Sequence, residues 1–198
     1  MTQRTDTYAP TTQEPAMGLR EQLAQDLVKA IPDIRETIGS APRDGLHTLD
    51  FLRQLLLGKT PEEAITLLTY GLSPRHAVWW GHECLQVMPD LVTDNDRSLM
   101  GLAAAWVAEP DEDNRYAALE AGMAAHPRGP GAWLAIAAGW SSGSISDRGQ
   151  PAVPAPPHLL SRALNACILT ALARVPQDKR RRLLEHYVSM GEVLAKSG

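Results

Sequence analysis

Apolar residues recur every three or four positions over most of this chain. Two stretches near the N-terminus, residues 19–31 and 46–58, show this spacing clearly. Such spacing places apolar side chains on one face of an α-helix, whereas a half-buried strand alternates apolar and polar residues. The sequence contains no stretch that alternates in this way, and its β-branched residues are scattered. The pattern therefore predicts an all-α protein.

Proline and capping residues mark where the helices should begin. Thr60, Pro61 and Glu63 form a capping pattern, in which the Glu63 side chain is expected to bind the Thr60 amide. Proline suits a helix start because it has no amide hydrogen to lose there. Further starts are expected near Pro74, Thr93, Pro110, Pro130, Pro157 and Pro176. These starts predict an irregular bundle, or a short stack of helical hairpins, of about nine helices.

One internal segment, residues 141–157, interrupts the helical pattern. It reads SSGSISDRGQPAVPAPP, and we expect it to run extended over the surface, either flexible or bound along a groove. The two helices that follow are too few to form a core of their own, so they should pack back on the others. We expect a single helical domain over residues 17–198, after a disordered polar tail over residues 1–16.

Composition and charge narrow the class of protein. The net charge of −4 gives no reason to expect nucleic acid or an anionic membrane as a partner. No apolar run is long enough to cross a bilayer, and residues 1–16 lack the apolar segment of a secretory signal. Cys84 and Cys167 lie far apart, which excludes a disulfide framework and suggests a reducing compartment. We therefore expect a cytoplasmic protein.

The tryptophans are the most informative side chains. Five of the ten aromatic residues are tryptophan, and all five lie between residues 79 and 140. Tryptophan fills cores, and it is also enriched at the binding hot spots of interfaces. Trp79 and Trp80 are about 100° apart around a helix, so we expect one to anchor the core and the other to face a groove.

Candidate catalytic patterns are weak. Residues 139–143 match G-x-S-x-G, but a helix rather than a strand is expected before Ser141. His82 and Glu83 begin the zinc pattern H-E-x-x-H, which fails at Gln86. His76 and His82 lie on different sides of a helix and cannot bind one metal together. We predict no catalytic residue, metal site or cofactor.

The basic run over residues 179–182 is the only one in the chain. It stands in the first turns of a predicted helix, where the helix dipole disfavours positive charge. A solvated helix face explains it most simply, and an acidic partner or a phosphate is the alternative.

Four sequence motifs resemble those of an uncharacterised bacterial all-helical family. The motifs are an Ala-Val-Trp-Trp helix over 77–80, a Trp-Val-Ala-Glu-Pro helix end over 106–110, a Trp-Ser-x-Gly-Ser turn over 140–144, and a Pro-Pro-His-Leu step over 156–159. The similarity covers most of residues 60–190. The family is associated with type VI secretion gene neighbourhoods, which implies an accessory adaptor or chaperone that holds an effector or a spike-tip protein. It supplies no catalytic residues.

The leading hypothesis is thus a non-enzymatic module that binds another protein. Its predicted surface combines Trp79 or Trp80 with Trp140, Ser141 and His158. One alternative is a small helical enzyme that uses the histidines at 76, 82 and 158, or Glu83, as acid–base groups. Another is a structural subunit of a larger assembly. The sequence leaves the oligomeric state open.

Overall fold

The computed structural model describes residues 18–197, and its secondary structure there is helical. Ten α-helices form within this range, and the described residues contain three isolated bridges but no β-strand. The predicted all-α fold is confirmed. The tail expected over residues 1–16 lies outside the described residues. The elements are α1 (Ala24–Ala30), α2 (Ile34–Thr37), α3 (Thr48–Leu56), α4 (Glu62–Gly71), α5 (Pro74–Gln86), the 3₁₀ helix η1 (Pro89–Leu91), α6 (Asp94–Ala108), α7 (Glu112–Ala124), α8 (Pro130–Gly139), α9 (Pro157–Ala173) and α10 (Gln177–Lys196).

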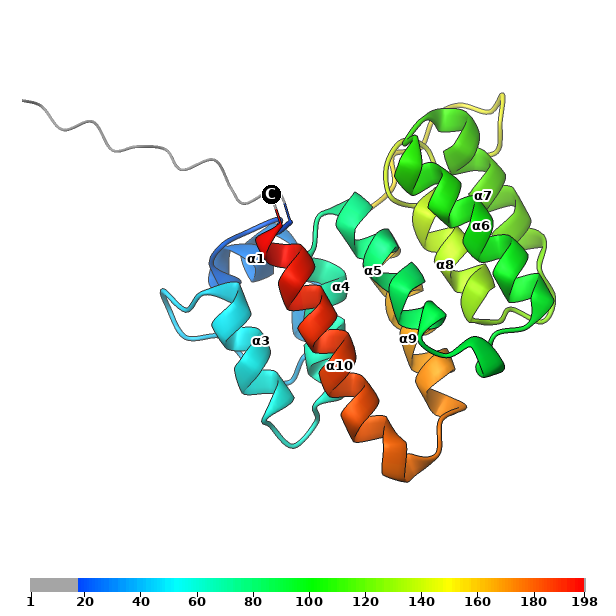
Figure 1. Ribbon diagram of the computed structural model, residues 1–198. Coiled ribbons are helices and arrows are strands. Elements are labelled where there is room, and N and C mark those ends of the chain that lie inside the picture. The colour runs from blue at the N-terminus through cyan, green and yellow to red at the C-terminus, as the bar shows by residue number, and fades with distance from the viewer. Residues whose placement is uncertain (1–17, 198) are drawn as a thin grey trace, which may run out of the picture.

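Helix α8 is the most enclosed element. All its residues except Trp133 are buried, as expected for a helix that is apolar on every side. It contacts α5, α6, α7 and α9. Helices α5 and α9 lie between the α6–α8 group and the N-terminal helices (Figure 1). A Cβ atom on Gly131 would lie 2.5 Å from the backbone of Asp96. Glycine therefore lets the start of α8 approach α6 closely.

Most helices begin where the sequence predicts. Helices α5, α8 and α9 start at their prolines. The Thr93 hydroxyl accepts a hydrogen bond from the Asp96 amide at 3.1 Å, and the Asp96 carboxylate accepts one from the Thr93 amide at 3.2 Å. This reciprocal pair satisfies two backbone donors that the first turn of α6 would otherwise leave unpaired.

The capping pattern expected at Thr60 is wrong. Helix α4 begins at Glu62, and no side chain caps it. The Glu63 carboxylate instead accepts a hydrogen bond from the Gly39 amide at 3.3 Å. A contact with a loop 24 residues earlier in the chain thus replaces the local one.

The first helix is shorter than its apolar spacing predicts. Helix α1 spans only Ala24–Ala30, and Leu19 lies in extended backbone that bridges to Leu72. The Arg20 amide donates to the Gly71 carbonyl at 2.8 Å, which fixes this stretch to the end of α4. Leu19 is nevertheless buried, because a long-range backbone pairing carries it into the core.

The last two helices pack back on the rest of the molecule, as expected. Helix α9 contacts α4, α5 and α8, and α10 contacts α3, α4 and α5. One apolar cluster runs through the described residues from Leu19 to Ala195. The segment over residues 141–157 therefore connects parts of one core.

Candidate functional site

The two neighbouring tryptophans of α5 lie in different environments, one buried and one exposed. Trp80 is fully buried, and its indole nitrogen donates to the backbone carbonyl of Tyr187 in α10 at 2.9 Å. The Tyr187 hydroxyl in turn donates to the Cys84 carbonyl at 2.8 Å. The expectation that Trp80 could serve a docking surface is wrong for this fold, because a partner cannot reach its ring. Trp80 instead joins α5 to α10.

Trp79 is the exposed member of the pair, with 36% of its surface accessible. Its ring lies parallel to that of His82, with the centroids 5.0 Å apart and the planes 8° apart. His82 is itself buried, and its Nδ1 atom lies 3.0 Å from the Glu83 carboxylate. Stacking on the buried His82 ring therefore orients the Trp79 indole, which stays partly exposed to solvent.

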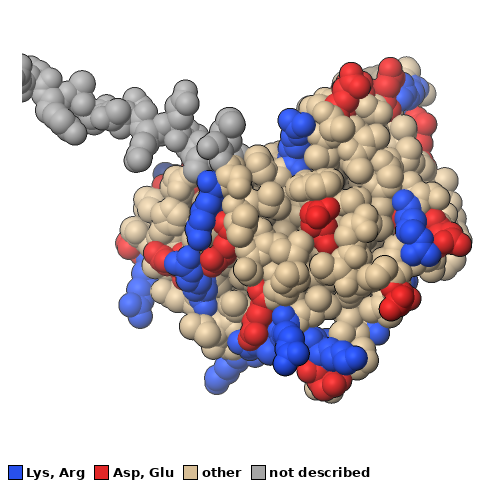
Figure 2. All heavy atoms as spheres, viewed as in Figure 1, with Lys and Arg blue, Asp and Glu red and all other residues tan. Residues whose placement is uncertain are grey.

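The outer face of α5 is also fixed to α6. The Arg75 guanidinium, one turn before Trp79, donates to the carbonyls of Val107 at 2.7 Å and Ala108 at 3.4 Å. Carbonyls at a helix end lack partners within their own helix, so this contact closes α6. Val87, two turns beyond Trp79, is 43% exposed. Figure 2 shows mostly uncharged atoms around α5, with one acidic group in the middle of this face and one basic group near its upper end.

The histidines considered as acid–base groups do not gather at one place. His76 lies at the start of α5, where its Nδ1 is 2.7 Å from the Ser73 hydroxyl, and burial lowers its pKa. His158 lies at the start of α9. His82 and Glu83 are in contact, but within residues 18–197 none of the three cavities described is lined by any of these side chains.

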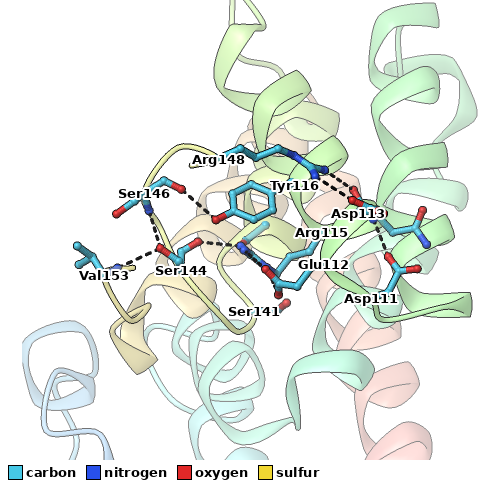
Figure 3. A network of polar contacts seen from close by, with 12 residues as sticks. Asp111, Glu112, Asp113, Arg115, Tyr116, Ser141, Ser144, Ser146, Arg148 and Val153 are labelled. Carbon is cyan, nitrogen blue, oxygen red and sulfur yellow. Dashed lines mark hydrogen bonds and ion pairs between the residues drawn. The ribbon is translucent and has the colours of Figure 1, made fainter. Parts of the chain in front are cut away.

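Residues 141–157, which we call the strip, are held by a buried arginine of α7. The Arg115 side chain is fully buried and donates through Nη1 to the carbonyls of Gly139 at 2.7 Å and Ser144 at 2.9 Å (Figure 3). Its Nε and Nη2 atoms donate to the two carboxylate oxygens of Glu112 at 2.8 and 2.7 Å. One guanidinium thus joins α7, the end of α8 and the strip through charge-assisted hydrogen bonds.

A second arginine covers this network from outside. The Tyr116 ring lies between the guanidinium groups of Arg115, at 4.1 Å, and Arg148, at 4.7 Å. The Tyr116 hydroxyl donates to the Ser146 carbonyl at 3.2 Å. Arg148 also donates to the Asp113 carboxylate at 2.8 Å. The strip is therefore attached to α7 through Ser144, Ser146 and Arg148 (Figure 3).

The strip is irregular and lies at the surface, as predicted, but it doubles back instead of running extended. The Ile145 amide donates to the Val153 carbonyl at 2.9 Å. The Ser144 hydroxyl accepts from the amides of Ser146 at 3.1 Å and Val153 at 3.0 Å. Gly143 has a φ of 64°, a value that glycine adopts without strain and that opens this turn. Backbone and hydroxyl contacts therefore fold the strip onto itself.

The other predicted surface residues lie at the two ends of the strip. Trp140 is half-buried and packs against the core. The Ser141 hydroxyl donates to the carbonyl three residues earlier at 2.6 Å, so it serves the end of α8. His158 lies 3.3 Å from the Asp33 carboxylate, beside α2. Among the described residues, no hydrogen bond or ring contact joins these side chains to Trp79.

Sequence reasoning missed Arg115. A glutamate three residues before an arginine on a helix is typical of a solvated surface pair. Burial here depends on the turn after α8, whose carbonyls converge on the guanidinium. Only the glycine and serine content of residues 139–144 hinted at a tight turn, and it did not indicate a partner.

The two cysteines are poorly suited to nucleophilic chemistry. Cys84 and Cys167 are buried and unpaired, and burial raises the pKa of both thiols. A buried thiol with a raised pKa is a poor nucleophile. Residues 18–197 contain no group of three His, Cys, Asp or Glu side chains placed to hold a metal ion.

Comparison with known protein families assigns most of the chain to one family. A family model matches residues 51–195, from α3 to the last turn of α10. The chain belongs to DUF6931, a family of unknown function. The DUF6931 region includes Trp79, Arg115 and the whole strip. Searches of curated proteins and of solved structures found no significant match. None of the described helices of this DUF6931 member combines the length and apolar character needed to cross a membrane.

Proposed function

We propose that this chain is a non-enzymatic protein-interaction module whose docking surface centres on Trp79. The observation that carries the proposal is the exposed indole held flat against His82. A tryptophan that is ordered before binding loses little side-chain entropy when a partner covers it. Tryptophan is one of the three residue types enriched among the side chains that dominate binding energy at interfaces.

The surroundings of Trp79 support this proposal. Trp80 anchors the same helix in the core, and Arg75 fixes it to α6, so the indole stands on a rigid support. Val87 extends the apolar character of this face towards the end of α5. An adaptor needs a surface of fixed shape, which these contacts provide.

The strip supplies a second candidate contact surface. Val153 is 48% exposed, while Arg115 and Ser144 fix the backbone around it. A long surface loop held in one conformation is typical of binding segments on a rigid scaffold. Its attachment to α7 through a buried charge is more than a passive linker requires.

The biological setting of the proposal comes from the sequence resemblance alone. It is a cytoplasmic accessory role in a bacterial, type VI-like secretion system, in which the chain holds an effector or a spike-tip protein before loading.

Affinity purification from the native host, followed by mass spectrometry, tests the proposal. Trp79→Ala should lose the main partner, and with purified partner the Kd should rise at least about tenfold. Leu57→Ala is the matched control, because Leu57 is 81% exposed on α3's C-terminal side and should not affect binding.

Two outcomes would contradict different parts of the proposal. An unchanged partner set for a folded Trp79→Ala variant would exclude the Trp79 surface. A partner that Trp79→Ala loses, but that is no secretion component, would exclude the secretion role and leave the interaction module standing.

A further inference from the structure

The outer face of α5 carries a carboxylate one turn after the exposed indole. Residues four positions apart are neighbours on a helix surface, with Cβ atoms about 5–6 Å apart, so Glu83 borders Trp79. The Glu83 side chain is 36% exposed, and Trp79 is exposed to the same extent. An accessible aromatic ring and an accessible carboxylate therefore stand side by side on one helix.

The contacts of Glu83 fix its position and leave its charge available. Its Oε1 atom lies 3.0 Å from the Nδ1 atom of His82. A carboxylate can only accept a hydrogen bond, so Nδ1 is the donor, and a neutral imidazole donates without cancelling the negative charge. Within residues 18–197, neither a lysine nor an arginine forms an ion pair with Glu83. The carboxylate is thus oriented by a ring that also orients Trp79.

The cation on the same face, Arg75, has its donors in use. Its guanidinium binds the carbonyls of Val107 and Ala108, at the end of α6. These carbonyls are the negative end of the α6 dipole, so they offset the charge of Arg75. Around α5, Figure 2 shows one acidic and one basic group among mostly uncharged atoms. The charge that this face offers to a partner is therefore the negative one.

The Trp79 ring adds its own attraction for positive charge. Indole is the best of the aromatic rings at binding a cation over its face, because its π electrons make that face negative. His82 stacks on one face of the Trp79 ring, and the remaining ring surface is open to solvent. A cation that lies on this open surface can at the same time reach the carboxylate of Glu83.

Arginine matches this pair of groups better than other side chains do. Its planar guanidinium stacks on aromatic rings and donates to both oxygens of a carboxylate, whereas the lysine ammonium is a compact, strongly hydrated charge. An acidic partner residue would meet Glu83 as a like charge. A wholly apolar partner would cover the Glu83 carboxylate without giving it a hydrogen bond, which costs free energy.

We propose that Trp79 and Glu83 together bind an arginine side chain of the partner protein. The guanidinium lies over the open part of the indole and donates to the Glu83 carboxylate, while apolar residues beside the arginine contact Val87. The arginine site rests on the proposed function, because it specifies what the Trp79 surface recognises. The net charge of −4 favours the approach of a segment that carries positive charge.

Peptide selection tests this proposal. A random peptide library displayed on phage is first depleted on the Trp79→Ala variant, which removes peptides that bind elsewhere, and is then selected on the wild-type chain. Enriched peptides should contain arginine. The strongest of them, labelled with fluorescein, is titrated by fluorescence anisotropy near neutral pH. Replacing its arginine with citrulline, which keeps the shape but carries no charge, should raise the Kd about three- to tenfold.

Substitutions at position 83 separate charge from shape. Glu83→Gln keeps an acceptor for His82, and should weaken binding of the arginine peptide about as much as citrulline does, with little further effect on the citrulline peptide. Glu83→Arg should prefer a peptide in which glutamate replaces the arginine. The matched control is Glu62→Gln, which makes the same change at an exposed residue of α4 and should leave the Kd within about twofold.

The outcomes separate failure of the arginine site from failure of the proposed function. Trp79-dependent peptides that lack arginine, or an arginine peptide that binds Glu83→Gln as tightly as the wild type, would overturn the arginine site and leave docking at Trp79 standing. Equal weakening by Glu83→Gln and Glu62→Gln would do the same, because the loss would then reflect overall charge. A selection that yields no Trp79-dependent peptide would overturn both.

Discussion

Helix α5 and the strip both present surfaces of fixed shape, but different forces hold them. Helix α5 is anchored by a buried indole, Trp80, which packs in the main core and bonds to α10. The strip is anchored by a buried guanidinium, Arg115, which binds backbone carbonyls. Apolar burial stabilises the whole fold, whereas the polar network orders one segment. Replacing Trp80 should therefore destabilise the whole fold, whereas replacing Arg115 should mainly loosen the strip.

The largest expected effect is on the α5 side. Trp80→Ala should lower the free energy of unfolding by about 3–5 kcal/mol, because it removes a fully buried ring and leaves a cavity. Trp79→Ala should lower it by less than about 1 kcal/mol, since much of that ring is already in solvent. Urea denaturation followed by circular dichroism measures both. Equal losses of unfolding free energy in the two variants would show that the buried Trp80 ring stabilises the core no more than the exposed Trp79 ring does.

The second-largest effect is expected from Arg115, whose replacement should change the strip but not α5. Arg115→Met should lower the free energy of unfolding by about 2–4 kcal/mol, because the carbonyls of Gly139 and Ser144 lose their donor. Hydrogen exchange of the strip should become faster, while the amides of α5 keep their protection. Methionine retains most of the side-chain volume, so lost packing contributes little. Uniform acceleration across the molecule would contradict a local role for Arg115.

A smaller effect should arise within the strip. Ser144→Ala removes the acceptor of two amides, and should lower the free energy of unfolding by about 1 kcal/mol. The amides of Ser146 and Val153 should exchange faster in nuclear magnetic resonance measurements. Ser142→Ala is the control, because Ser142 is exposed. If Ser142→Ala accelerates the same amides, the fold of the strip does not depend on the Ser144 hydroxyl.

The smallest effect should depend on pH. The hydrogen bond from Arg115, with its positive charge, lowers the pKa of Glu112 below the ordinary value of 4.5. A lowered folded-state pKa adds stability that is fully present above the unfolded pKa and is lost as the pH falls through the folded one. The difference in unfolding free energy between the wild type and Glu112→Gln should therefore be constant near neutrality and shrink below pH 4.5. A difference that grows on acidification would reverse this assignment.

The sequence predicted features that depend on local chemistry. Proline starts and the Thr93 cap located most helices, and the angle of about 100° between successive helix residues predicted that one of Trp79 and Trp80 would be buried. Which tryptophan is buried depends on where α10 packs, which no local pattern indicates. The same limit explains the unpredicted contact between Glu63 and Gly39.

The candidate site was harder to predict than the fold. Arg115 binds carbonyls 24 and 29 residues later in the chain, and these meet it only because α8 ends beside α7. The strip doubles back through contacts of the Ser144 hydroxyl with backbone amides, which composition alone cannot specify. Long-range polar contacts therefore account for most of what spacing and composition did not reveal.

The enclosure of Cys84 and Cys167 has a practical consequence for all such measurements. Neither thiol should react with maleimide dyes while the molecule stays folded, so a single cysteine introduced on the outside can be labelled without first removing the natural ones. The two natural cysteines can then serve as probes of core opening. The rate at which a disulfide reagent modifies these thiols reports how often the core opens transiently, so variants can be ranked by that rate.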